Sequence, residues 1–200
     1  LIPAEGLVYS GAVVMSPSGR VVTTGTVTGT VQFADYSDPR QPRVVGSVAA
    51  QPTLNETVDY SEKSGLAITG ATDGNSLTVI DATTLSAPRV VSRFDAGGGI
   101  AWASLSPDGR TAAVATVTGP VRLIDLSNPA APQAYPDPIR FKASALSVRF
   151  DAAGTSIVAT SEERNVEVAD ISDRRHPRRT IELSGPAGQL YSAGFSADGK

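Results

Sequence analysis

Four aspartates recur along the chain at a nearly constant interval, and they are the first residues to test for chemistry. Successive members are 46, 44 and 45 residues apart, and they are Asp35, Asp81, Asp125 and Asp170. A ring of carboxylates could bind a metal ion or perform acid–base catalysis. An aspartate that ends an apolar run can instead accept hydrogen bonds from the backbone N–H groups of a turn. Each of the four ends such a run, so we expect the turn role and no metal site or cofactor.

An arginine-rich segment surrounds the single histidine, His176. Its neighbours are Arg174, Arg175, Arg178 and Arg179. Four cations disfavour a metal-ligand role for His176. Two alternatives remain for the segment: a solvated loop, or contact with a carboxylate or phosphate through bidentate arginines. We therefore keep Arg174, Arg175 and Arg178 as candidate contacts to a partner.

The only tryptophan, Trp102, occupies a position where the other repeats have small residues. The equivalent residues are Ala12, Thr57, Ser147 and Ser192. The indole could fill the space left by the three glycines at 97–99, or it could be the aromatic anchor of a binding surface. The loops that precede the corresponding segments vary in length and chemistry, and function is often found in such loops. They add three candidate partner contacts, Gln51, Asn55 and Gln189.

The composition excludes several classes of protein. The chain has 200 residues, a formal charge of −3 and no cysteine. Disulfides and thiolate chemistry are therefore excluded, and the acidic balance argues against a specific nucleic-acid binder. No apolar run approaches the roughly 18 residues that a membrane-spanning helix needs. We expect a globular chain located in the cytoplasm.

A repeat of about 45 residues positions all of these side chains. Five-residue turn signals recur, and their glycines are Gly19, Gly65, Gly109, Gly154 and Gly199. Each turn is preceded by an alternating apolar run and followed by two short runs of strand-forming residues, a proline-rich connection and a weaker outer run. The hairpins between the second and third runs contain Gly29, Gly74, Gly119 and Arg164. The units cover approximately residues 7–48, 55–94, 100–135 and 145–183, and a fifth begins at 190.

Four antiparallel strands per unit at this period predict a blade of a β-propeller. We expect an all-β fold in which about four consecutive four-stranded blades form part of a larger, seven-bladed ring. The 200 residues would then be an open arc that forms one partial propeller domain. We expect no helix.

The repeats resemble those of the WD-repeat family. The resemblance rests on Ser106-Pro107-Asp108-Gly109-Arg110, followed by a strand, a glycine turn and Val121-Arg122-Leu123-Ile124-Asp125. Ile124-Asp125 and Ile80-Asp81 stand where that family has Trp-Asp. The segment after Asp125 is similar to variants in large bacterial signalling proteins and to a second bacterial propeller repeat with a Leu-Val-Ile-Val-Asp run. The family's Gly-His pair and its tryptophan do not occur here, so we expect apolar packing to replace its buried hydrogen-bond network.

Three functions are compatible with these features. The resemblance implies a non-catalytic protein-interaction or scaffold module of a larger bacterial signalling or regulatory protein, with a protein partner. The alternative is a propeller enzyme or small-ligand binder, such as a lactonase-like hydrolase, that uses the central channel. It would need several polar residues at the ends of the inner strands, where the sequence offers Asp59 and Glu56 from one blade only. A third alternative is a segment that only stabilises a neighbouring domain.

Overall fold

Strands alone make up the secondary structure of the computed structural model, which describes residues 7–184 and 190–196. Sixteen strands form four separate four-stranded antiparallel sheets, and in each sheet the strands lie side by side in chain order. No helix occurs among the described residues, so none of them forms an apolar helix of membrane-spanning length. The prediction of four consecutive antiparallel blades is confirmed.

The blades are numbered here in chain order. Blade 1 contains β1 (Val8–Met15), β2 (Val21–Thr26), β3 (Thr30–Asp35) and β4 (Arg43–Ala49). Blade 2 contains β5 (Thr57–Ser61), β6 (Leu66–Gly70), β7 (Ser76–Asp81) and β8 (Arg89–Asp95). Blade 3 contains β9 (Ile100–Leu105), β10 (Thr111–Thr116), β11 (Arg122–Asp125) and β12 (Gln133–Ala134). Blade 4 contains β13 (Ala145–Phe150), β14 (Ser156–Ser161), β15 (Asn165–Asp170) and β16 (Arg178–Ser184).

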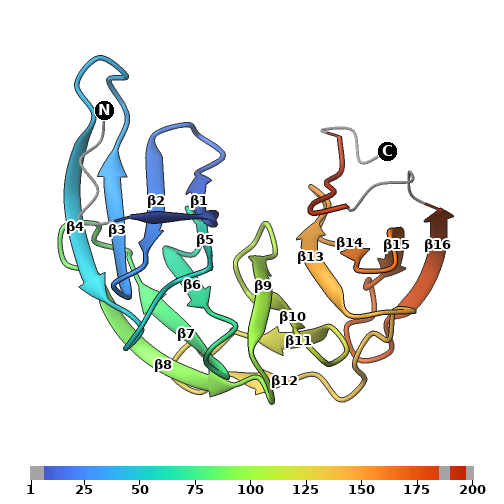
Figure 1. The fold of residues 1–200 in the computed structure, drawn as a ribbon. Helices are drawn as coiled ribbons and strands as arrows, with labels where there is room; N and C mark the ends of the chain where they lie inside the picture. The colour runs from blue at the N-terminus through green and yellow to red at the C-terminus, as the bar shows by residue number, and fades with distance from the viewer. Residues whose placement is uncertain (1–6, 185–189, 197–200) are drawn as a thin grey trace.

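The four blades follow one another around an open arc (Figure 1). The first strand of each blade lies on the inner side, and β1, β5, β9 and β13 contact one another in succession. The two ends of the arc remain apart in Figure 1, as the sequence predicts for part of a ring. Each junction between successive blades therefore repeats the same geometry with different side chains.

Local turn chemistry explains where the first strands end. Gly19, Gly65, Gly109 and Gly154 all have φ between 68° and 71°, a region that glycine enters without steric cost. In the next hairpin of blades 1 and 4, Gly29 and Arg164 also have positive φ, at 82° and 64°. Gly74 and Gly119 do not, although their N–H groups also close turns onto the carbonyls of Ala71 and Thr116. In these two blades a longer connection reverses the chain, so no left-handed residue is needed at either glycine.

The repeated aspartates end the third strands, as predicted. In each blade the Oδ1 atom accepts the backbone N–H of the residue two positions later, at 2.8–3.1 Å. These hydrogen bonds lower the pKa of Asp35 to about 2 and lower the pKa of Asp170. The pKa of Asp81 is lowered first by the hydroxyl of Thr83 and then by the backbone N–H of the same residue. Asp35 and Asp81 also pair with Arg43 and Arg89 of the following strand. Within the described ranges, no three acidic or histidine side chains are grouped to hold a metal ion.

Apolar packing fills each junction. Phe33 and Val31 of blade 1 pack with Tyr60 of blade 2, and the Phe33 and Tyr60 rings meet edge to face at 5.8 Å. Ile68 and Leu77 of blade 2 pack in one cluster with Ile100 of blade 3. The junction between blades 3 and 4 is built in the same way. The apolar cores therefore lie between successive sheets.

The outer strand of blade 3 is interrupted. Strand β12 has only two residues, and Pro136 and Pro138 follow it before Val121 and Ile139 form an isolated bridge. Proline lacks the N–H that a ladder needs, so pairing cannot continue through this segment. Residues 190–196 form no strand, and the fifth unit stays a prediction.

Candidate functional site

The inner strands surround a hollow of about 720 Å³. It lies on the face of the four blades that carries the glycine turns. Residues from all four blades line it. Most of the lining is apolar, with Met15, Tyr60, Leu105 and Phe150 each contributed by a different blade. The side chain of Met15 is 52% exposed. The hollow is therefore a shared apolar surface, and no single loop forms it.

Every acidic side chain that lines the hollow accepts hydrogen bonds within the fold. Asp59 on β5 accepts the N–H of Leu105 at 2.7 Å and the hydroxyl of Ser104 at 3.1 Å, both from blade 3. Glu62 accepts the hydroxyl of Ser18 at 2.7 Å, which joins blade 2 to blade 1. Asp151 accepts the N–H of Thr155 at 2.8 Å and closes its own turn. These carboxylates join blades or close turns.

Asp59 is the carboxyl group with the most unusual environment. Burial raises its pKa above the ordinary value, while the hydrogen bonds from Leu105 and Tyr60 and the charge of Arg149 oppose this shift. A carboxyl group with a raised pKa can transfer protons near neutral pH. Here its oxygens already accept three hydrogen bonds, including the one from the N–H of Tyr60 at 2.8 Å.

Trp102 lies on β9 opposite Ala115 and is partly buried. It packs against the apolar cluster between blades 3 and 4. The guanidinium of Arg149, on the next inner strand, lies 5.1 Å from the centroid of the indole ring. This distance is within the range of a cation–π interaction. The indole therefore fills space in the junction while part of it stays accessible, so its role as a partner anchor stays a prediction.

The comparisons with known proteins identify the architecture. A crystal structure of the β-propeller domain of Cps50 (Swd1) from Myceliophteria thermophila superposes with a TM-score of 0.77 over 98% of this chain. The fold is a β-propeller. At 15% identity the likeness concerns the fold alone, and the chain spans 61% of the length of that domain. No family model matches the chain, and no curated protein matches it in sequence.

Asn55 and Gln51, two residues predicted to contact a partner, instead join blades 1 and 2. The Asn55 side chain is fully buried, and its Nδ2 donates to the carbonyls of Thr26 and Thr30 at 3.3 and 3.1 Å. Its Oδ1 accepts the hydroxyl of Thr69 at 2.8 Å. Asn55 is therefore unavailable to a partner, which corrects the sequence-based expectation. Gln51 is half-buried, and its Nε2 donates to backbone carbonyls of blade 2 at 3.1 and 3.4 Å.

The predicted arginines lie at the opposite end of the blades from Gln51 and Asn55. Arg174 is half-buried, and its Nε donates to the hydroxyl of Thr111 in blade 3 at 2.8 Å. Arg175 and Arg178 are exposed. The structure therefore does not gather the predicted contacts into one surface. Gln189 lies outside the described residues.

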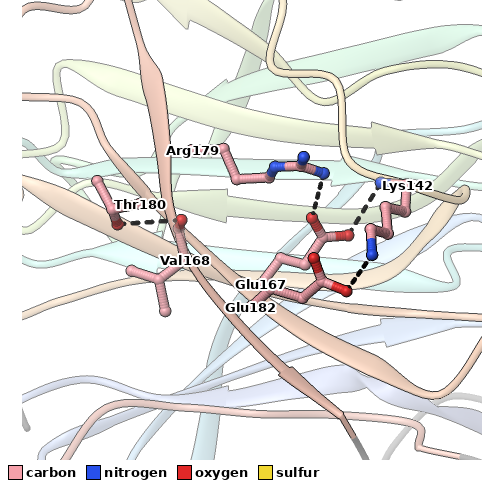
Figure 2. A network of polar contacts seen from close by, with 6 residues as sticks. All are labelled: Lys142, Glu167, Val168, Arg179, Thr180 and Glu182. Carbon is pink, nitrogen blue, oxygen red and sulfur yellow. Dashed lines mark hydrogen bonds and ion pairs between the residues drawn. The ribbon is translucent and has the colours of Figure 1, made fainter.

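Sequence reasoning missed one polar network, which fastens blade 4 to the connection that leads into it (Figure 2). Glu167 is only 1% exposed, and it accepts the backbone N–H of Lys142 at 2.9 Å and the guanidinium of Arg179 at 2.8 Å. The ammonium of Lys142 pairs with Glu182. The available signal was a charged residue between two valines on the third strand of blade 4.

Proposed function

We propose that this chain is a non-catalytic protein-interaction or scaffold module, with repeats of the WD type, in a larger cytoplasmic signalling or regulatory protein of bacteria. One observation carries the proposal: each acidic group around the central hollow already accepts hydrogen bonds that join or close blades. A catalytic carboxylate must be able to reach a substrate. The carboxylates here support the frame, and the accessible part of the hollow is largely apolar.

The form of the hollow supports a protein partner. Side chains from four blades contribute to one apolar surface, and apolar packing between the sheets fixes their positions. Protein interfaces use such apolar centres surrounded by polar rims. Glu62 and Lys63 also line this surface and supply one negative and one positive charge.

The test compares two exposed apolar positions at opposite ends of the blades. Met15 lines the hollow, and Val117, which is also exposed, lies in the hairpin after β10. A partner captured from the source cells by the parent chain is expected to bind Met15→Glu about tenfold more weakly and Val117→Glu unchanged. Calorimetry with the purified partner gives both affinities. Equal binding by both variants would place the interface elsewhere.

The environment of Asp59 favours the second candidate, a hydrolase or small-ligand binder that uses the central channel. Burial raises its pKa above the ordinary value, and perturbed carboxyl groups are common at catalytic sites. If the chain hydrolyses lactones, Asp59→Asn should abolish turnover while Asp151→Asn retains it. Turnover by the parent chain with this pattern would replace the scaffold proposal.

A further inference from the structure

The connection that follows each repeated aspartate of blades 2, 3 and 4 contacts the preceding blade. A different residue type makes this contact at each junction. It is the fourth residue after the aspartate, namely Leu85, Pro129 or Arg174. Leu85 packs in the first junction, where Gly46 has no side chain; a Cβ at Gly46 would lie 2.0 Å from the Leu85 carbonyl oxygen. In the third junction, the guanidinium of Arg174 reaches Thr111.

The second junction has the short ring of Pro129 at this position. The Pro129 carbonyl accepts the hydroxyl of Ser92 at 2.6 Å, which fixes the backbone, but the ring fills little space. A groove of about 710 Å³ lies between blades 2 and 3 as a result, compared with about 460 Å³ between blades 1 and 2. The residues that line the groove come from the sheet of β5–β8 and the sheet of β9–β12 and their connections. These two sheets are neighbours along the arc in Figure 1.

The groove has an apolar floor and a cationic rim. The buried side chains of Leu66 and Leu126, one from each blade, form its base, and the half-buried Val91 adds accessible apolar surface. Two acidic residues also line it, and both are already engaged. Asp81 pairs with Arg89 at 2.6 Å and accepts the N–H of Thr83, and Asp108 accepts the hydroxyl of Ser106 at 2.6 Å and the N–H of Arg110.

Two cations at the rim remain available. The side-chain heads of Lys63 and Arg110 are exposed and form no hydrogen bond or ion pair with the residues that the structure describes. The charge of Arg110 acts on the nearby carboxylate of Asp108, but its side chain makes no hydrogen bond to it. The groove therefore offers apolar contact at its floor and accessible positive charge at its edge. An acidic segment would be complementary to it, whereas a basic segment would be repelled.

We propose that the groove between blades 2 and 3 binds an extended peptide segment of a partner protein in which apolar and acidic residues alternate. Successive side chains of an extended segment point to opposite sides. The apolar residues contact Leu66, Val91 and Leu126, and the acidic residues pair with Lys63 and Arg110. This site is separate from the central hollow apart from Lys63, which lies at the edge of both.

Two labelled synthetic peptides test the proposal with the full 200-residue chain. One is Ser-Glu-Leu-Glu-Val-Glu-Ser, and the other has glutamine in place of each glutamate, which keeps the shape and removes the charge. Fluorescence anisotropy should show about tenfold tighter binding of the acidic peptide, because each of the two exposed charge contacts should strengthen binding about threefold. The preference should decrease as salt is added.

Two variants and a matched control assign the binding to the groove. Lys63→Glu/Arg110→Glu should remove the preference for the acidic peptide. Arg40→Glu/Arg140→Glu makes the same charge change at exposed arginines away from the groove and should retain it. Pro129→Leu, which imitates Leu85, should weaken both peptides about fivefold or more because it fills the groove without changing the charge.

Circular dichroism of each variant shows whether the sheets are intact. The proposal is overturned if the parent chain shows no saturable binding of the acidic peptide up to millimolar concentrations, or if folded Lys63→Glu/Arg110→Glu binds it as the parent does. The result is independent of partner capture at Met15, so a failure here leaves the function proposed for the hollow intact.

Discussion

The junction between blades 1 and 2 and the junction between blades 3 and 4 are both formed by successive inner strands but use different polar groups. The buried part of the first is fastened by a neutral amide, because Asn55 hydrogen-bonds Thr26 and Thr30 on one side and Thr69 on the other. A charged contact, from Ser18 to Glu62, lies at its exposed edge. The last uses charged side chains, because Arg174 crosses to Thr111 of blade 3. Glu167 pairs with Arg179 within blade 4 and accepts the backbone N–H of Lys142 in the connection from blade 3. The repeat therefore specifies where blades meet but not which polar groups join them.

This difference should appear in how each junction responds to solvent. Hydrogen bonds between neutral groups are insensitive to salt, whereas interactions between partly exposed charges are screened. A neutral, buried contact such as Asn55 is costly to break because its donors and acceptors lose their partners out of contact with water. A charged contact with one accessible member, such as Arg179, can be replaced in part by water.

The largest effect is expected for Asn55→Leu, which keeps the branched shape of the side chain and removes its three hydrogen bonds to Thr26, Thr30 and Thr69. We expect a loss of about 3 kcal/mol in the free energy of unfolding. Urea denaturation followed by circular dichroism measures it. Gln51→Leu is the control and should lose about half as much, since Gln51 is half-buried and makes two such bonds. A loss below about 1 kcal/mol for Asn55→Leu would contradict the account of this junction.

Glu167→Leu should cost about 2 kcal/mol, because the N–H of Lys142 loses its acceptor while Arg179 can turn toward water. Glu167→Gln retains an acceptor and should cost about half as much. Raising the salt concentration to about 1 M should reduce the difference between the parent and Glu167→Gln. The same salt should leave the difference between the parent and Asn55→Leu unchanged. If both differences respond equally to salt, the contrast between the two junctions is wrong.

Arg174→Ala should lower the free energy of unfolding by about 1 kcal/mol, through loss of the hydrogen bond to Thr111. The matched control is Arg175→Ala, at the exposed neighbouring arginine, which should stay within about 0.5 kcal/mol of the parent. Chemical denaturation of the two variants side by side measures the difference. Equal values would mean that the guanidinium of Arg174 contributes nothing to the junction.

We expect the smallest difference between the two junctions when the pH is lowered. Acid should reduce the stability of variants in either junction to the same extent. The lowered pKa values of Asp35, Asp81 and Asp170 belong to turns in blades 1, 2 and 4. A carboxyl group with a depressed pKa in the folded state stabilises the fold above its unfolded value of 3.8, and this stability is lost as the pH falls through the folded value, which is about 2 for Asp35.

Thermal unfolding at pH values from about 5 to about 2 checks this expectation. The melting temperature should fall with a similar slope in the parent, Asn55→Leu and Glu167→Leu. Asp35→Asn should show a shallower slope than the parent. A steeper acid response in one junction variant alone would show that acid acts on a single junction.

Features set by neighbours in the chain could be predicted from the sequence. Gly65 and Gly109 adopt the positive φ of a turn that favours glycine. Asp81 and Asp125 each accept a hydrogen bond from the backbone N–H two residues later. These interactions are local and recur in each repeat, so their spacing revealed four blades. Gly74 shows the limit, because a longer hairpin removed the need for positive φ.

Contacts between blades could not be predicted in the same way. Arg174 meets a residue 63 positions earlier, and Asn55 meets one 29 positions earlier, so neither contact follows from a local pattern. Asn55 was expected at the surface because it lies in a variable loop, but the fold turns it into the junction. The central hollow and the groove beside Pro129 depend on side-chain volumes across junctions, which the repeat does not encode.

The burial of Asn55 has a consequence for glycosylation. Asn55-Glu56-Thr57 matches the acceptor sequence for N-linked glycans. A glycan would be attached at Nδ2, the atom that donates to Thr26 and Thr30. In a eukaryotic secretory pathway, a glycan added before folding would keep blade 2 from closing on blade 1, and after folding the enclosed amide would be out of reach of the transferase. Production in that pathway is therefore expected to yield either unmodified folded chains or glycosylated chains that do not fold.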